Sequence, residues 1–181
     1  MKSITLAPLP KWRQLITTLI PLSIRDDKLA SPWCRVDDKA FWFARSATSL
    51  SIIASWNQKL FKKKVVTVWL PDFFCNASLE PIRKTDARLV FYPVTDKMIP
   101  DIELCRKLVA EASPDIFVLV HYFGQPTPVD PIFSLCKENG AWLVEDATHL
   151  LRPIPGVGEF GDCVIYSPHK HLPIPDGALL I

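Results

Sequence analysis

The chain has 181 residues, of which 49% are hydrophobic, so it can bury one sizeable core and should be globular rather than disordered. Its 21 Lys and Arg residues against 19 Asp and Glu residues leave a formal charge of +2. This near-balance excludes a global electrostatic field that would attract nucleic acid. The basic run at residues 59–64 is short and typical of a solvated helix end, so it does not change that conclusion.

The five cysteines are scattered, and no two of them form a CxxC pair. An odd, scattered set is typical of reduced thiols, which favours a cytoplasmic location. Near the N-terminus, residues 11–14 interrupt the apolar stretch with charge, and no cleavage site follows a continuous apolar segment. We therefore predict neither a signal peptide nor a membrane span.

The first 40 residues are poorly patterned, and we interpret them as an N-terminal arm with a short helix near 12–19 and a loop at 25–33. From residue 41 to residue 181 we expect one domain. Its first helix is predicted from residue 46, with Ser46 as the N-cap.

Strand and helix patterns alternate from there onward. The strand at 116–123 is apolar on both faces, as expected where helices cover both faces of a parallel sheet. We therefore predict an α/β fold with three layers, α/β/α, and a mostly parallel central sheet. The expected elements after residue 60 are strands at 65–71, 88–93, 116–123 and 141–145, and helices at 101–112 and 130–139.

In such sheets ligands bind at the carboxyl ends of the strands, where loops and helix N-termini converge. Polar residues follow three of the predicted strands at 121–124, 145–149 and 166–171. These segments are where we expect the functional residues.

Two patterns suggest other chemistry. Gly156, Gly158 and Gly161 match GxGxxG, but they neither come straight off a strand nor open a helix, so we interpret them as a turn. His169 and His171 could face the same way on an extended segment and bind zinc, as in a metal-dependent hydrolase. Two polar loop histidines explain the same pattern, and we predict no metal site.

Asp146 and Lys170 form the third candidate. A carboxylate at the end of a buried strand is costly unless it meets a cation or hydrogen-bond donors, so the two residues could form a simple ion pair. They are also what a pyridoxal phosphate enzyme requires: a lysine for the Schiff base, and a carboxylate that keeps the pyridine nitrogen protonated. The helix start at 46–48 offers N–H groups and hydroxyls for the phosphate.

The segments 120–149 and 158–180 resemble the DegT/DnrJ/StrS-type sugar aminotransferases, which are pyridoxal phosphate enzymes of the type I aspartate aminotransferase fold. The similarity runs from about Phe41 to the end of the sequence, through RSATSL (45–50) and LPDFFCNASLEPI (70–82), in the family's order. The resemblance implies the large domain of that fold, truncated before the small C-terminal domain, and a homodimer.

The resemblance also implies roles for single residues. Asp146 would pair with the pyridinium nitrogen, and Lys170 would form the Schiff base and shuttle the proton. His149 would lie near the cofactor hydroxyl, and Phe74, or else Phe73, would cover the ring.

For the cofactor phosphate, the resemblance implies a loop at the start of the first long helix. The implied contacts come from Ser46, Ala47, Thr48 and Ser167.

The activity that the resemblance implies is transfer of an amino group from an amino acid donor to a small keto substrate, such as a nucleotide-linked keto sugar, through Lys170. A second interpretation is a truncated or degenerate homologue that folds and serves as a binding module without catalysis. We expect neither a nucleic acid nor a membrane as a partner.

Overall fold

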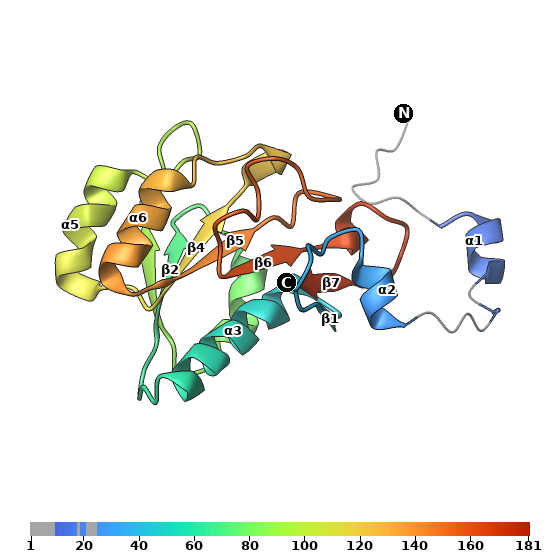
Figure 1. Cartoon of the computed structure of the whole chain (residues 1–181), viewed down its shortest axis with the longest axis horizontal. Helices are drawn as coiled ribbons and strands as arrows, with labels where there is room; N and C mark the ends of the chain where they lie inside the picture. The colour runs from blue at the N-terminus through green and yellow to red at the C-terminus, as the bar shows by residue number, and fades with distance from the viewer. Residues whose placement is uncertain (1–9, 18, 21–24) are drawn as a thin grey trace.

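A computed structural model describes residues 10–17, 19–20 and 25–181. Its centre is a seven-stranded sheet in the order β1-β7-β6-β5-β4-β2-β3 (Figure 1). Strands β2 to β6 are parallel to one another, whereas β7 is antiparallel to both of its neighbours. The strands are β1 (Phe41–Phe43), β2 (Thr67–Pro71), β3 (Arg88–Tyr92), β4 (Ile116–Val120), β5 (Trp142–Asp146), β6 (Cys163–Tyr166) and β7 (Ala178–Leu180).

Helices connect the strands and cover the sheet (Figure 1). The α-helices are α1 (Trp12–Thr17), α2 (Asp26–Ala30), α3 (Ser46–Leu60), α4 (Glu80–Arg83), α5 (Ile102–Ala112) and α6 (Asp130–Asn139). Three short 3₁₀ turns, η1 (Asn76–Leu79), η2 (Tyr122–Gly124) and η3 (Pro168–Lys170), each follow the end of a strand on the chain.

The sheet is buried on both faces, which confirms the predicted three-layer α/β/α arrangement. On one face Ile53 of α3 packs with Val68 and Val118, and on the other Leu135 of α6 packs with Phe117. Successive residues of a strand point to opposite faces, so each parallel strand contributes to both cores. This explains why β4 is apolar throughout.

The helix ends follow the sequence in part. Asp101 caps α5, because its carboxylate accepts a hydrogen bond of 3.0 Å from the Leu104 N–H. Gly140 ends α6 in the left-handed conformation, with φ of 64°. Ser46 is the first helical residue of α3 rather than its N-cap, which is Arg45 and makes no side-chain capping bond.

Near the β1 edge, the segment expected as a loop at 25–33 contains the short helix α2. Ala30 at its end is fully buried and packs with Ala147 and Leu179. Within the described part of the chain, no helix is both long and apolar enough to cross a membrane.

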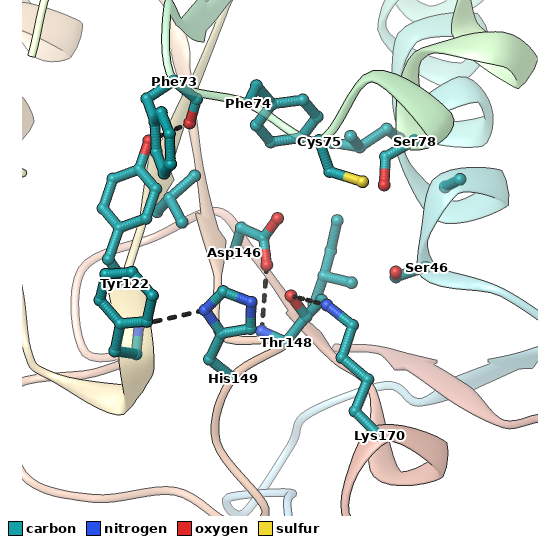
Figure 2. A pocket seen from close by; sticks show the side chains of 15 residues that line it. Ser46, Phe73, Phe74, Cys75, Ser78, Tyr122, Asp146, Thr148, His149 and Lys170 are labelled. Carbon is teal, nitrogen blue, oxygen red and sulfur yellow. Dashed lines mark hydrogen bonds between the residues drawn. The ribbon is translucent and has the colours of Figure 1, made fainter. Parts of the chain in front are cut away.

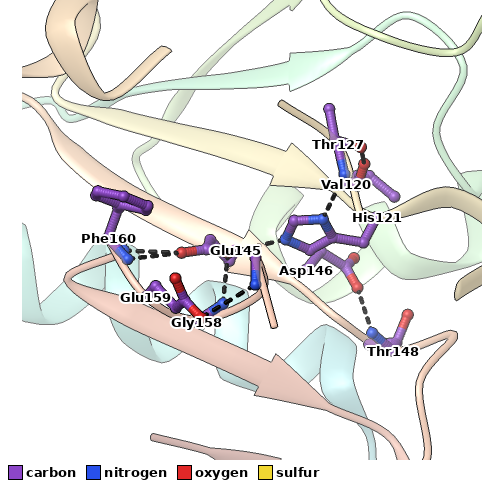
Figure 3. A network of polar contacts seen from close by, with 11 residues as sticks. Val120, His121, Thr127, Glu145, Asp146, Thr148, Gly158, Glu159 and Phe160 are labelled. Atoms are coloured by element: carbon purple, nitrogen blue, oxygen red, sulfur yellow. Dashed lines mark hydrogen bonds and ion pairs between the residues drawn. The ribbon is translucent and has the colours of Figure 1, made fainter. Parts of the chain in front are cut away.

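A buried carboxylate lies at the end of β5 (Figure 3). Glu145 and His121 are both fully buried, and His121 Nε2 lies 2.8 Å from Glu145 Oε2. The Thr127 N–H donates to His121 Nδ1 at 3.0 Å, so the ring is neutral and its own hydrogen lies on Nε2. His121 therefore donates to Glu145 and joins the ends of β4 and β5.

The GxGxxG segment supplies the other donors to this carboxylate (Figure 3). The N–H of Gly158 donates to Oε2 at 2.7 Å, and the N–H groups of Gly161 and Phe160 donate to Oε1 at 2.8 and 3.3 Å. Gly158 has φ of +71°, which favours glycine. The segment is thus a turn, and its backbone binds an anion that belongs to the protein itself.

These donors decide the charge of Glu145. Burial raises the pKa of its carboxyl group, but hydrogen bonds from His121, Gly158 and Gly161 outweigh burial and lower the pKa below its ordinary value of 4.5. The folded protein therefore holds Glu145 ionised, fully inside the core.

We predict that Glu145→Gln lowers the free energy of unfolding by about 3 kcal/mol at pH 7. The amide would turn an N–H₂ group toward backbone N–H groups that now donate to a carboxylate oxygen. Urea unfolding followed by circular dichroism measures the change. The matched control is Glu111→Gln on the exposed surface of α5, which should change stability by less than about 0.5 kcal/mol.

The same carboxylate predicts a dependence on pH. Because its folded pKa is lowered, the unfolded state binds more protons below pH 4.5, and the stability from Glu145 is present above 4.5 and lost as pH falls through the folded pKa. The difference in stability between wild type and Glu145→Gln should therefore shrink as pH falls below 4.5. A difference that stays constant to pH 3 would contradict an ionised Glu145.

Candidate functional site

A pocket of about 250 Å³ opens at the carboxyl ends of the parallel strands, close to the lower end of the usual range for small-molecule sites (Figure 2). Its lining comes from the start of α3, the segment after β2, and the segments that follow β4, β5 and β6. Seven residues named from the sequence line it: Ser46, Ala47, Phe73, Phe74, Asp146, His149 and Lys170.

Asp146 is the last residue of β5 and is 9% exposed. The strand alternates, so Glu145 points toward α6 while Asp146 points toward α3 and the pocket. Its Oδ1 accepts a hydrogen bond of 3.0 Å from the Thr148 N–H, and Oδ2 has no hydrogen-bond partner among the described residues. The site therefore presents half of a carboxylate that is available to a ligand.

Lys170 ends the turn η3 after β6, and its side chain reaches into the same pocket (Figure 2). Its Nζ donates to Thr148 Oγ1 at 3.0 Å. Across the described ranges it makes no ion pair with Asp146, so the simple ion pair considered from the sequence is wrong. The amine and the carboxylate face one cavity without neutralising each other.

Thr148 is a site residue that the sequence reasoning missed. It is 5% exposed, lines the pocket and contacts both Asp146 and Lys170. Its position two residues after a strand-end carboxylate was the available signal, since short polar side chains there often bond to neighbouring groups.

His149 borders the pocket in its neutral form. Its Nδ1 accepts a hydrogen bond of 3.1 Å from the Phe123 N–H, so the ring hydrogen lies on Nε2. Burial, and then the positive charge of Lys170, lower the pKa of His149. The ring also stacks on Phe123, with ring centres 6.1 Å apart and an angle of 19° between the planes.

Phe123 has φ of +54°, a left-handed conformation that is uncommon outside glycine. Its backbone bond and ring stacking to His149 hold it there, and its side chain is 71% exposed at the pocket. Such strained residues occur often at ligand sites.

Aromatic residues form one wall of the pocket (Figure 2). The Tyr122 hydroxyl donates to the Phe73 carbonyl at 2.6 Å and so ties the segment after β2 to the turn after β4. The Phe73 and Tyr122 rings are 5.8 Å apart, and Phe74 lies on the same segment. This wall can cover a planar ring.

The wall nearest α3 suits an anion. Ser46 and Ala47 are in the first turn of a 15-residue helix, where N–H groups lack helix partners and no acidic residue is present. Ser78 adds a hydroxyl to the same lining. A hydrogen bond with the Ser78 side chain lowers the pKa of the neighbouring Cys75 thiol, although burial raises it. Backbone N–H groups and the charge of Lys170 lower this pKa by smaller amounts.

Two predicted cofactor contacts lie outside the pocket lining. Ser167 is fully buried, and its Oγ lies 3.1 Å from His169 Nδ1, which also lies 3.0 Å from the Gly177 carbonyl. Thr48 lies in the first turn of α3, but its N–H already donates to the Arg45 carbonyl. In the described part of the chain, no three His, Cys, Asp or Glu residues are placed to hold a metal ion.

Curated relatives match only part of the chain. Serine hydroxymethyltransferase from Pyrococcus horikoshii is 35% identical over 89 residues, which is 45% of this chain and 21% of the relative. The enzyme of the same name from Pyrobaculum arsenaticum is 29% identical over 94 residues, which is 47% of this chain and 21% of the relative. The matched region is thus about a fifth of each relative.

Solved structures match the fold more widely. The aminotransferase TlmJ from Streptoalloteichus hindustanus has a TM-score of 0.69 at 23% identity, over 85% of this chain and 43% of TlmJ. The E. coli GDP-4-keto-6-deoxy-D-mannose-3-dehydratase, solved with bound hydrated PLP, has a TM-score of 0.74 at 16% identity, over 93% of this chain and 46% of the dehydratase. At these identities the likeness shows the fold alone.

One protein-family model matches most of the sequence. The model for the DegT/DnrJ/EryC1/StrS aminotransferase family matches residues 46–181, which include the whole pocket. Because this match covers well over half of the chain, the protein belongs to the DegT/DnrJ/EryC1/StrS aminotransferase family.

Proposed function

We propose that the pocket binds pyridoxal phosphate and serves the transfer of an amino group from an amino acid to a keto substrate. One observation carries the proposal: the Lys170 amine and the buried Asp146 carboxylate face one cavity without pairing to each other. Lysine and carboxylate are the two groups that this cofactor needs from a protein. The structure of the similar E. coli dehydratase, described with bound hydrated PLP, supports the choice of cofactor.

The residues present fit the chemical parts of the cofactor. Asp146 Oδ2, which lacks a protein partner among the described residues, would accept the hydrogen of the pyridinium nitrogen. Phe74 or Phe73 would cover the ring, and the Nε2–H of His149 would meet the ring hydroxyl. The first turn of α3, with Ser46, would bind the phosphate.

The chain contributes charge and proton transfer. When bound, pyridoxal phosphate supplies an electron sink for the bonds to the substrate α-carbon. Asp146 would hold a proton on the pyridine nitrogen, and the apolar walls would limit water around it. Lys170 would hold the cofactor through its aldehyde group, and once the amino group of the donor replaces it there, the freed amine would be placed to move the substrate proton. Thr48 and Ser167 have no part in this assignment.

The substrate and assembly rest on the family. A nucleotide-linked keto sugar is the keto substrate that we propose, which the name of the E. coli dehydratase supports. We assign residues 41–181 to the cofactor-binding large domain and propose a homodimer, as the family resemblance implies. The chain spans less than half of the solved structures it matches, so activity of the whole enzyme is part of the proposal. The five free cysteines support a cytoplasmic location.

We predict that the wild-type protein develops a visible absorption band when mixed with pyridoxal phosphate, and that Lys170→Ala does not. Only an amine held in the pocket should react with the aldehyde at low cofactor concentration. Absorption spectroscopy after removal of free cofactor measures the band. Lys84→Ala, at an exposed residue of the ion pair with Glu80, is the matched control and should keep the band.

Persistence of the band in Lys170→Ala would contradict the role of Lys170. A band in the wild type without amino transfer would favour the alternative of a binding module without catalysis.

We predict that Asp146→Ala binds pyridoxal phosphate 10- to 100-fold more weakly, which corresponds to about 1.5–3 kcal/mol for a hydrogen bond to a charged group. Equilibrium dialysis measures the affinity. The fold should persist, because Oδ2 has no partner among the described residues and the backbone of Asp146 keeps its strand bonds. Loss of the circular dichroism spectrum would instead indicate a structural role for Asp146.

A further inference from the structure

Thr148 contacts both groups that the proposed function uses (Figure 2). Its backbone N–H donates to Asp146 Oδ1, and its Oγ1 accepts from Lys170 Nζ, each at 3.0 Å. It is 5% exposed, on the segment directly after β5. One residue thus links a carboxylate on one strand end to a lysine on the turn after the neighbouring strand.

We propose that Thr148 is a positioning residue that holds the Lys170 amine in the pocket before the cofactor arrives; this inference rests on the proposed function. A lysine side chain has many rotamers and places its amine poorly unless a partner fixes it. Thr148 is a suitable partner because its β-branched side chain has few rotamers and its backbone is itself bonded to Asp146. The acceptor oxygen is therefore held in one direction.

The neutral acceptor also explains why Asp146 stays available. If Lys170 paired with Asp146, the carboxylate would lose its free oxygen, and it would be left buried without a partner when the amine reacted. A threonine hydroxyl can both accept and donate hydrogen bonds. The hydrogen bond between Lys170 and Thr148 can therefore be broken at small cost. Thr148 thus separates the two groups and keeps both ready.

The backbone and side-chain contacts of Thr148 can be tested apart. Thr148→Val keeps the shape and the N–H bond to Asp146 but removes the hydroxyl, whereas Thr148→Ser keeps the hydroxyl. The first measurement uses the cofactor-free protein, labelled with trinitrobenzenesulfonate and mapped by peptide mass spectrometry. We expect Lys170 to be labelled about fivefold faster in the valine variant, because the amine has lost the hydrogen bond to Thr148 and one hydrogen bond corresponds to about that factor.

Lys84 serves as an internal reference and should be labelled at the same rate in every variant. Thr148→Ser should restore the wild-type rate at Lys170 to within about twofold. A valine variant that labels Lys170 at the wild-type rate would overturn the inference. If the valine variant does not fold by circular dichroism, Thr148→Ala provides the same comparison.

The second measurement is the rate at which the visible band appears on mixing with pyridoxal phosphate. We expect this rate to fall about fivefold in Thr148→Val and to recover in Thr148→Ser. An unchanged rate in the valine variant would count against the inference. Absence of a band in the wild type would overturn the proposed function, while the labelling of the cofactor-free protein would still decide the role of Thr148.

Discussion

The pocket depends on one buried anion, the carboxylate of Glu145. A neutral histidine and three backbone N–H groups donate to it, and together they keep an ionised side chain fully inside the core. These bonds join the end of β4, the end of β5 and the turn that precedes β6. Because an unpaired charge there would be costly, the three segments are held in one arrangement.

That arrangement decides where the polar side chains of the pocket point. Glu145 faces α6, so its neighbour Asp146 faces α3 and enters the pocket. The next polar residue, Thr148, fixes one oxygen of Asp146 and also binds the amine of Lys170. A carboxylate bonded inside the core and a carboxylate facing the pocket therefore lie side by side in the sequence and have different partners because a strand alternates.

The pocket combines apolar walls with few polar groups whose bonds are incomplete. Aromatic side chains after β2 and β4 line one wall, while Asp146 keeps one oxygen without a partner in the described part of the chain. His149 is neutral and donates only from Nε2, since the Phe123 N–H occupies Nδ1. Incomplete bonding of this kind leaves specific positions for a ligand, which is how small-molecule sites obtain orientation.

By itself the sequence determined the alternation of strands and helices and the two-sided core, and it indicated that Asp146 and Lys170 lie near strand ends, because hydrophobic period and strand ends are local properties. Only the tertiary structure decided the partners. Glu145 pairs with the glycine turn, and Thr148 binds Lys170, across segments that are distant in the sequence. The packing of the turn after β6 decides that Ser167 lies outside the pocket lining and contacts His169. No local pattern encodes which hydrogen-bond donor reaches which acceptor when the two lie far apart in the sequence.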